Sequence, residues 1–250
     1  MDEQRFVRIG GIEQWISIRG EDTANPVMIE IHGGPGASHS VHAARTRAWE
    51  EHFTVVRWGM RGAGRTFGRS GARGQGEMSF QQLYEDALDV TRYARERLGA
   101  DRVVLVASSL GSVFGLRLAR SHPELYSAYV GSGSLWFSPL HSLREIGQYF
   151  AGMKFSARLT PALAAFDDRA DGTRFELPFF VFQGDRDVIT PAERARSFFD
   201  EVEAPVKEFA LIEDVGHFAA FRHPDRFLHL LRTRVRPVVT DGSPSCRPGR

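Results

Sequence analysis

The sequence predicts an α/β fold, in which a mostly parallel central sheet has helices on both faces. Short apolar runs alternate with amphipathic stretches through the middle of the chain, as in strands joined by helical crossovers. The run at residues 103–107, Val-Val-Leu-Val-Ala, has no polar position, which is typical of a strand buried on both faces. Two alternating stretches around Gly10-Gly11 predict an antiparallel N-terminal hairpin at one edge of this sheet.

Composition limits the class of protein. The chain has 250 residues, 42% of them apolar, and a net charge of +1. These values favour one globular domain and argue against a nucleic-acid or membrane partner. Cys246 is the single cysteine, so a disulfide framework is excluded. We expect a cytoplasmic protein without a signal peptide or a membrane span, and nothing in the sequence sets its oligomeric state.

The expected elements follow in order along a single domain at residues 1–240. Expected strands are the short apolar or alternating segments at residues 6–9, 12–18, 26–31, 53–58, 103–107, 128–133, 178–183 and 207–212. Expected helices are the segments at residues 43–52, 79–98, 110–122, 190–203 and 224–235. Ser79 and Gly99 should cap the second of these helices. Residues 134–177 are expected to form a short helical cap, and residues 241–250 a disordered tail.

A cluster of small residues follows the strand at residues 103–107. Ala107-x-Ser109-x-Gly111 approximates G-x-S-x-G, the strand–turn–helix motif that presents a nucleophilic serine. Such a turn strains the serine backbone, and its neighbours must be small. A serine is also a common helix N-cap, so the stretch by itself favours neither interpretation.

Residues later in the chain favour the catalytic interpretation. A serine hydroxyl needs a base, which is normally a histidine oriented by a carboxylate. His217 follows the last strand, and Asp187 lies between the preceding strand and a helix that Thr190 should cap. We therefore predict a Ser109–His217–Asp187 triad. Asp185 and Asp214 are the alternative acids; we expect the former to shape its loop, and the latter lies too close to the histidine's own loop.

The strand at residues 26–31 runs into His-Gly-Gly-Pro-Gly at residues 32–36. Glycine lets the backbone approach a developing oxyanion closely. We expect the N–H groups of Gly34 and Leu110 to form the oxyanion hole, with a cis peptide bond between Gly34 and Pro35. The remaining residues of this loop are expected to support that amide: His32, Gly33, Pro35 and Gly36.

These motifs, together with Arg61-Gly62-Ala63-Gly64-Arg65, resemble the proline iminopeptidase (prolyl aminopeptidase) branch of the α/β hydrolases over about residues 5–236. The resemblance implies an α/β-hydrolase fold and a serine hydrolase that cleaves a small peptide, amide or ester through an acyl-enzyme on Ser109. Its typical reaction releases an N-terminal residue, often proline, from a short peptide. Arg61 is then a structural residue supporting the site.

Three departures from the family pattern leave alternatives open. Trp58-Gly59-Met60 stands where relatives carry Trp-Asp-Gln, Leu110 stands where they carry tryptophan, and the cap is much shorter than theirs. The family's amine-binding glutamates cannot be aligned within this cap. A carboxylesterase with an open pocket, or a catalytically weakened binding member of the fold, therefore remains an alternative to the peptidase.

No cofactor or metal is expected. Gly62-Ala63-Gly64 begins like a dinucleotide fingerprint, but the third glycine is misplaced. His39 and His42 lie three residues apart without an acidic partner, so we expect packed or solvated histidines there.

Overall fold

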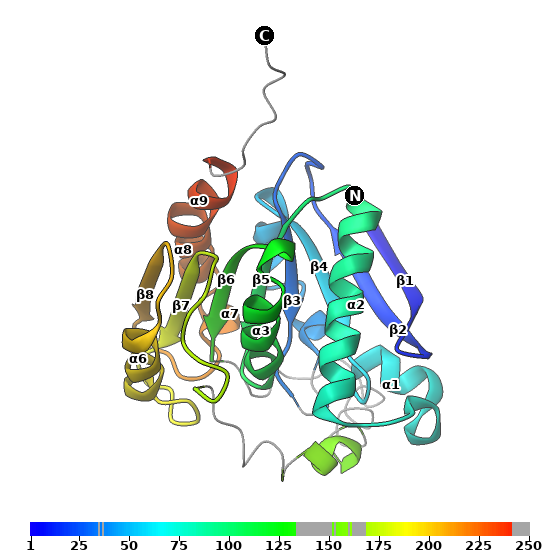
Figure 1. Ribbon diagram of the computed structural model, residues 1–250. Coiled ribbons are helices and arrows are strands. Elements are labelled where there is room, and N and C mark those ends of the chain that lie inside the picture. The colour runs from blue at the N-terminus through cyan, green and yellow to red at the C-terminus, as the bar shows by residue number, and fades with distance from the viewer. Residues whose placement is uncertain are drawn as a thin grey trace.

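A computed structural model describes residues 1–34, 36, 38–133, 152, 154–159, 161 and 169–241. At its centre is an eight-stranded sheet in the order β1-β2-β4-β3-β5-β6-β7-β8, with helices on both faces (Figure 1). This architecture confirms the predicted fold class. Within the described ranges, no helix is long and apolar enough to cross a membrane.

The antiparallel part of the sheet is confined to its N-terminal edge. β1 (Asp2–Ile9) and β2 (Ile12–Arg19) form the expected hairpin, which starts earlier than predicted. β2 also pairs antiparallel with β4 (Thr54–Gly59). From β4 onward each strand pairs parallel with the next one in the sheet. These strands are, in order, β3 (Val27–Ile31), β5 (Val103–Ser108), β6 (Tyr126–Ser132), β7 (Phe179–Gly184) and β8 (Lys207–Ile212).

Side chains on alternate positions of β5 enter two different cores. Val103, Leu105 and Ala107 belong to one apolar cluster, and Val104 and Val106 to another on the opposite face. Because both faces are covered, residues 103–107 of the strand are all apolar.

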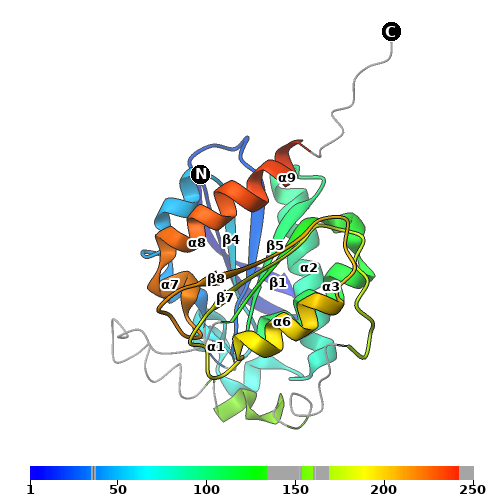
Figure 2. The same cartoon turned by 90° about the vertical axis from the view of Figure 1, so that its left-hand side faces the viewer.

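The two faces are covered by different helices (Figure 2). On one face lie three long helices: α2 (Phe80–Leu98), α3 (Leu110–Ser121) and α6 (Ala192–Glu201). The other face is covered by a 3₁₀ turn and the C-terminal helices: Arg47–Glu51, α7 (Ala219–Arg222), α8 (Pro224–Leu230) and α9 (Arg236–Asp241).

Several helix predictions hold and others need correction. Ser79 caps α2 by accepting a 3.1 Å hydrogen bond from the Gln82 N–H, and Gly99 ends it at φ +62°, as predicted. The helix expected at residues 43–52 is replaced by 3₁₀ turns at His39–His42 and Arg47–Glu51. The last helix continues past residue 235 through a π turn, Leu231–Val235, into α9. Residues 242–250 lie outside the described part of the chain.

The glycine- and arginine-rich loop after β4 contains a helix that the sequence prediction lacks. α1 (Gly64–Ser70) is followed by a 3₁₀ turn, Ala72–Gln75. Two glycines in seven residues give α1 a low intrinsic helix propensity. Tertiary contacts hold it instead, since the Thr66 hydroxyl accepts a 2.9 Å hydrogen bond from the Trp15 N–H.

Within the 134–177 segment, Phe155 packs over α1. Phe155 is buried, and its ring lies 5.9 Å from that of Phe67. Residues 157–159 form a 3₁₀ turn in which Leu159 joins the main core. Residues 134–151 of the expected helical cap lie outside the described residues.

Candidate active site

The residues predicted to carry chemistry follow four parallel strands at their carboxyl ends. Gly34 follows β3, Ser109 follows β5, Asp187 follows β7 and His217 follows β8. In open α/β sheets, ligands bind outside this edge. The topology therefore brings four loops, separated widely in the chain, to one end of the sheet.

Ser109 occupies the strained turn between β5 and α3. Its backbone lies at φ +50° and ψ −122°, one of two positive φ values among the described residues that are not glycine. A serine there costs conformational energy, and such strain clusters at functional sites. Ser109 stands at the N-cap position of α3, but its side chain makes no capping hydrogen bond. Instead, its Oγ lies 3.2 Å from the His217 Nε2.

Small neighbours let α3 approach the sheet at this turn. A Cβ on Gly111 would lie 2.3 Å from the carbonyl oxygen of Ile31, so no larger residue fits there. A Cβ on Gly115 would lie 2.5 Å from the Cβ of Ala107. Gly115 thus provides the space for Ala107, which stands where the motif ordinarily has its first glycine.

His217 is buried and bridges the serine to a carboxylate. Its Nδ1 lies 2.7 Å from the Asp187 Oδ2, while its Nε2 faces Ser109. The proton of a neutral imidazole therefore belongs on Nδ1, where it is donated to the carboxylate. This tautomer leaves the Nε2 lone pair free to accept the Ser109 hydroxyl proton.

Asp187 is buried but held in its charged form. Burial raises its pKa, but hydrogen bonds from His217 and Thr190 outweigh that effect, and the net pKa is lowered. Its Oδ1 accepts the backbone N–H groups of Ile189 and Thr190, both at 2.9 Å. The Oδ2 accepts bonds of 2.6 Å from the Thr190 hydroxyl and from the Gln183 side chain.

The two alternative acids, Asp185 and Asp214, have other hydrogen-bond partners. Asp185 accepts a 3.1 Å hydrogen bond from the Val215 N–H, which ties the acid loop to the histidine loop and lowers the Asp185 pKa. Asp214 pairs with Arg186 at the surface. Thr190 does not cap α6, contrary to the expectation, because its hydroxyl is bound to Asp187 and Pro191 stands at the N-cap position.

The two residues expected to form the oxyanion hole, Gly34 and Leu110, lie next to each other. Gly34 and Leu110 are both buried, and a Cβ built on Gly34 would lie 3.4 Å from the Leu110 Cδ2. Among the described residues, neither N–H has a hydrogen-bond acceptor. Backbone N–H groups without an acceptor can bind an oxyanion, so both remain candidates for this role. Pro35 lies outside the described residues, so the expected cis bond before it stays a prediction.

His32 orients the peptide that carries the Gly34 N–H. Its Nε2 accepts a 3.2 Å hydrogen bond from the Met60 N–H, so its proton lies on Nδ1. The Nδ1 lies 2.5 Å from the Gly33 carbonyl oxygen, to which it donates. Because the Gly33 carbonyl and the Gly34 N–H belong to one planar peptide unit, the imidazole fixes the direction of that N–H.

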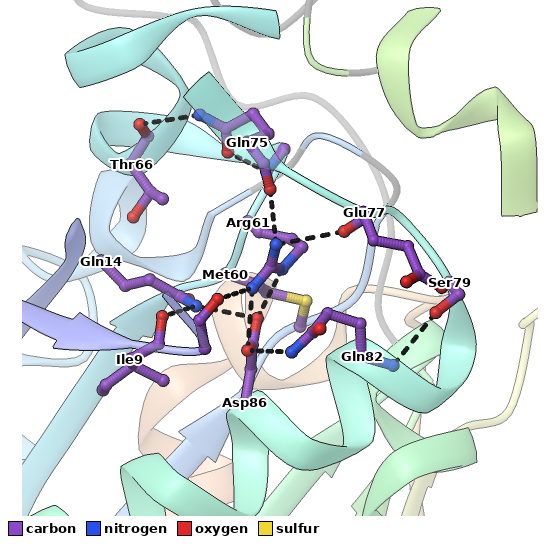
Figure 3. A network of polar contacts seen from close by, with 12 residues as sticks. Ile9, Gln14, Met60, Arg61, Thr66, Gln75, Glu77, Ser79, Gln82 and Asp86 are labelled. Atoms are coloured by element: carbon purple, nitrogen blue, oxygen red, sulfur yellow. Dashed lines mark hydrogen bonds and ion pairs between the residues drawn. The ribbon is translucent and has the colours of Figure 1, made fainter. Parts of the chain in front are cut away.

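Arg61 is buried at the centre of a polar network (Figure 3). It pairs with Asp86 of α2 through its Nε at 2.7 Å and its Nη2 at 3.0 Å. Its remaining donors bind the carbonyl groups of Gly10, Gln75 and Glu77. Arg61 therefore joins the hairpin, α2 and the segment after α1, and its guanidinium has no donor left for a substrate.

Sequence reasoning missed Gln183 and Thr190 as partners of the acid. Gln183 is the last residue but one of the otherwise apolar β7; its Nε2 donates to Asp187, and its Oε1 accepts the Gly133 N–H at 3.1 Å. A glutamine at the carboxyl end of a buried strand was the available signal. In the described part of the chain, no group of three or more His, Cys, Asp or Glu residues could hold a metal.

Comparison with known proteins agrees with this architecture. The family model described as alpha/beta hydrolase fold matches residues 26–159, more than half of the chain. The chain therefore belongs to the α/β-hydrolase fold family, and it is a hydrolase.

Particular relatives point to one branch of the family. Over 302 residues the chain is 21% identical to a probable aminopeptidase, YbaC, from Bacillus subtilis, covering 91% of this chain and 94% of that protein. Over 148 residues it is 33% identical to a probable proline iminopeptidase from Streptomyces coelicolor, covering 57% of this chain but only 44% of that protein. The similarity to proline iminopeptidases expected from the motifs is confirmed.

Solved structures agree on the fold. The crystal structure of a proline iminopeptidase-related protein from Thermus thermophilus superposes with a TM-score of 0.72 at 19% identity, covering 96% of this chain and 99% of that chain. At this identity the likeness shows the fold alone.

Proposed function

We propose that this hydrolase cleaves a small peptide, amide or ester bond through an acyl-enzyme on Ser109. The observation that carries the proposal is the hydrogen-bonded series Ser109–His217–Asp187, with 3.2 Å between Oγ and Nε2 and 2.7 Å between Nδ1 and Oδ2. His217 removes the hydroxyl proton as Ser109 attacks the carbonyl carbon. Asp187 stabilises the resulting imidazolium, and the N–H groups of Gly34 and Leu110 stabilise the oxyanion.

The second half of the reaction uses the same groups. His217 donates its new proton to the leaving group as the tetrahedral intermediate collapses to the acyl-enzyme. Water then attacks the ester while His217 removes one of its protons, and as the second tetrahedral intermediate collapses, His217 returns this proton to Ser109 and the acid is released. A proline iminopeptidase-like aminopeptidase is the favoured activity, supported by the motifs and by the names of the relatives.

A carboxylesterase is the second candidate, and two side chains favour it. Met60 and Leu110 are buried, apolar residues beside the oxyanion loop, where the family resemblance implies a polar and an aromatic side chain. An ester has no free amine to bind, so an acidic amine site would be unnecessary. A non-catalytic binding role is disfavoured, because it would not require the strained Ser109 or its hydrogen bond to His217.

A fluorophosphonate probe tests the shared mechanism. We expect covalent labelling of Ser109 that is lost in Ser109→Ala and strongly slowed in His217→Ala. Labelling that is unchanged in His217→Ala would reject the proposed base. Turnover of a proline arylamide against a short acyl ester then separates the two activities; hydrolysis of the ester alone would reject the peptidase.

A further inference from the structure

A pocket of about 470 Å³ adjoins the histidine loop. Its described walls come from three segments: Arg45 after the first 3₁₀ turn, residues 214–216 and Phe218 on either side of His217, and Arg222-His223 at the end of α7. Phe218 lines the pocket, and its ring centroid lies 5.8 Å from that of His217. The volume is within the range of small-molecule sites.

The lining is positively charged. Arg45 and Arg222 are exposed, and within the described part of the chain neither guanidinium forms a hydrogen bond or an ion pair. Asp214 is the acidic residue among the described lining groups, and its carboxylate is already paired with Arg186. Two guanidinium groups facing one cavity without an acidic partner favour an anionic ligand, because arginine binds carboxylates through two parallel N–H···O bonds.

The position of the pocket indicates which part of a substrate it would meet. The acyl carbonyl lies between Ser109 and the N–H groups of Gly34 and Leu110. The leaving group takes its proton from His217 and therefore departs beside the histidine loop. Phe218 lines the pocket, and its ring packs edge-on against the His217 ring, so the pocket borders the histidine from which the leaving group takes its proton.

We propose that this pocket binds the free carboxylate of the leaving fragment, as at the C-terminus of a short peptide. The proposal rests on the proposed function, and it adds a preference for substrates whose leaving fragment is anionic. Arg45 and Arg222 would bind the carboxylate, and Phe218 would contact the apolar part of the fragment. Neutral substrates would lack this interaction.

Binding can be measured without turnover. Ser109→Ala protein is titrated calorimetrically with trialanine and with trialanine amide, which differ only at the C-terminal carboxylate. We expect at least about tenfold tighter binding of trialanine, because charge-assisted bonds are stronger than neutral ones. Arg45→Gln and Arg222→Gln, each combined with Ser109→Ala, should reduce that ratio toward one. Arg47→Gln, an exposed arginine on the same segment outside the pocket, should keep it.

The outcomes separate this proposal from the hydrolase itself. Equal binding of the two ligands, binding of neither, or a ratio unaffected by both arginine changes would overturn the carboxylate pocket. Inorganic phosphate that binds as tightly as trialanine would also overturn it, since the pocket would then be a general anion site. Fluorophosphonate labelling reports on Ser109 and involves no carboxylate. Labelling of Ser109 without a preference for trialanine would reject the pocket alone. A preference for trialanine without labelling of Ser109 would reject the hydrolase mechanism alone.

Discussion

Asp187 and Asp86 are two buried carboxylates with different partners. Asp187 accepts five hydrogen bonds, four from its own loop and strand and one from His217. Asp86 accepts four, two of them from the permanently charged Arg61. An ion pair with arginine keeps the same charge throughout a reaction, whereas a carboxylate beside a neutral histidine is poised for a charge that forms during catalysis.

The difference assigns one carboxylate to chemistry and the other to architecture. The donors to Asp187 lie within a few residues of it, apart from His217, so its loop is organised locally around one charge. Asp86 instead joins distant segments, since Gln14 of β2, Arg61 after β4 and Gln82 of α2 all donate to it (Figure 3). Substitution of either aspartate should therefore affect a different measured quantity.

Replacing the acid should have the largest effect on catalysis. In Asp187→Asn the amide cannot hold His217 in the tautomer that accepts the serine proton, so kcat should fall by about 10⁴-fold. Steady-state kinetics and the rate of fluorophosphonate labelling measure this loss. Asp185→Asn is the matched control, because it changes an acid two residues away that contacts Val215 and not His217. Comparable losses in both variants would contradict the assignment of Asp187.

Replacing the structural aspartate should mainly change stability. Asp86→Ala leaves the buried Arg61 without its ion-pair partner, which should lower the free energy of unfolding by about 3–5 kcal/mol. Denaturant unfolding of the variant and the parent measures this difference. Asp89→Ala, on the same helix, removes an exposed pair with Arg92 and should cost about 0.5 kcal/mol or less. Equal losses of unfolding free energy in the two variants would show that the buried Arg61–Asp86 pair stabilises the fold no more than an exposed pair.

The surroundings of Asp187, which are local in the chain, were easier to predict from the sequence than those of Asp86, which come from distant segments. The strands were predictable because apolar runs mark them, and the residues of the active-site loops stand where those runs end. The Arg61–Asp86 pair was not, because the amphipathic pattern of α2 does not say which cation its one buried acid will meet. α1 was missed for a related reason: contacts with Trp15 and Phe155 stabilise a segment whose own composition disfavours a helix.

Thr190 shows the same limit within the site. A threonine just before a helix is an ordinary N-cap, and only the fold reveals that the hydroxyl binds the Asp187 carboxylate instead. Asp187 itself was predictable from its place between a strand and a helix. The hydrogen bond that Asp187 accepts from Gln183 was not predictable, since a polar residue near the end of a strand has many possible partners.

An intermediate effect is expected at the oxyanion loop. His32→Ala removes the imidazole that bridges the Met60 N–H and the Gly33 carbonyl, so the Gly34 N–H loses its fixed direction. Misplacement of one such group should lower kcat by about 10- to 100-fold. KM should change little, because the oxyanion exists only in the transition state and the intermediate. A rise in KM of about 10- to 100-fold with an unchanged kcat would contradict this positioning role.

The smallest effect tests how the Asp187 charge is stabilised. Burial raises the Asp187 pKa, but hydrogen bonds lower it by a larger amount. The net lowering of the pKa means that the ionised carboxylate stabilises the fold. This contribution is complete above the unfolded Asp pKa of about 3.9 and is lost as the pH falls through the lower pKa of the folded state. Thr190→Val removes one donor to the carboxylate and should cost about 1 kcal/mol at neutral pH.

Because the Thr190 bond is strongest to the ionised carboxylate, the cost of Thr190→Val should shrink in acid. Unfolding free energies of the parent and the variant, measured from pH 7 down to a pH below the lowered Asp187 pKa, should converge as Asp187 is protonated. Thr190→Ser keeps the hydroxyl and serves as the control that should follow the parent. A cost for Thr190→Val that is constant over this range would show that the threonine acts through packing, and the electrostatic contrast between Asp187 and Asp86 would then rest on His217 and Arg61 alone.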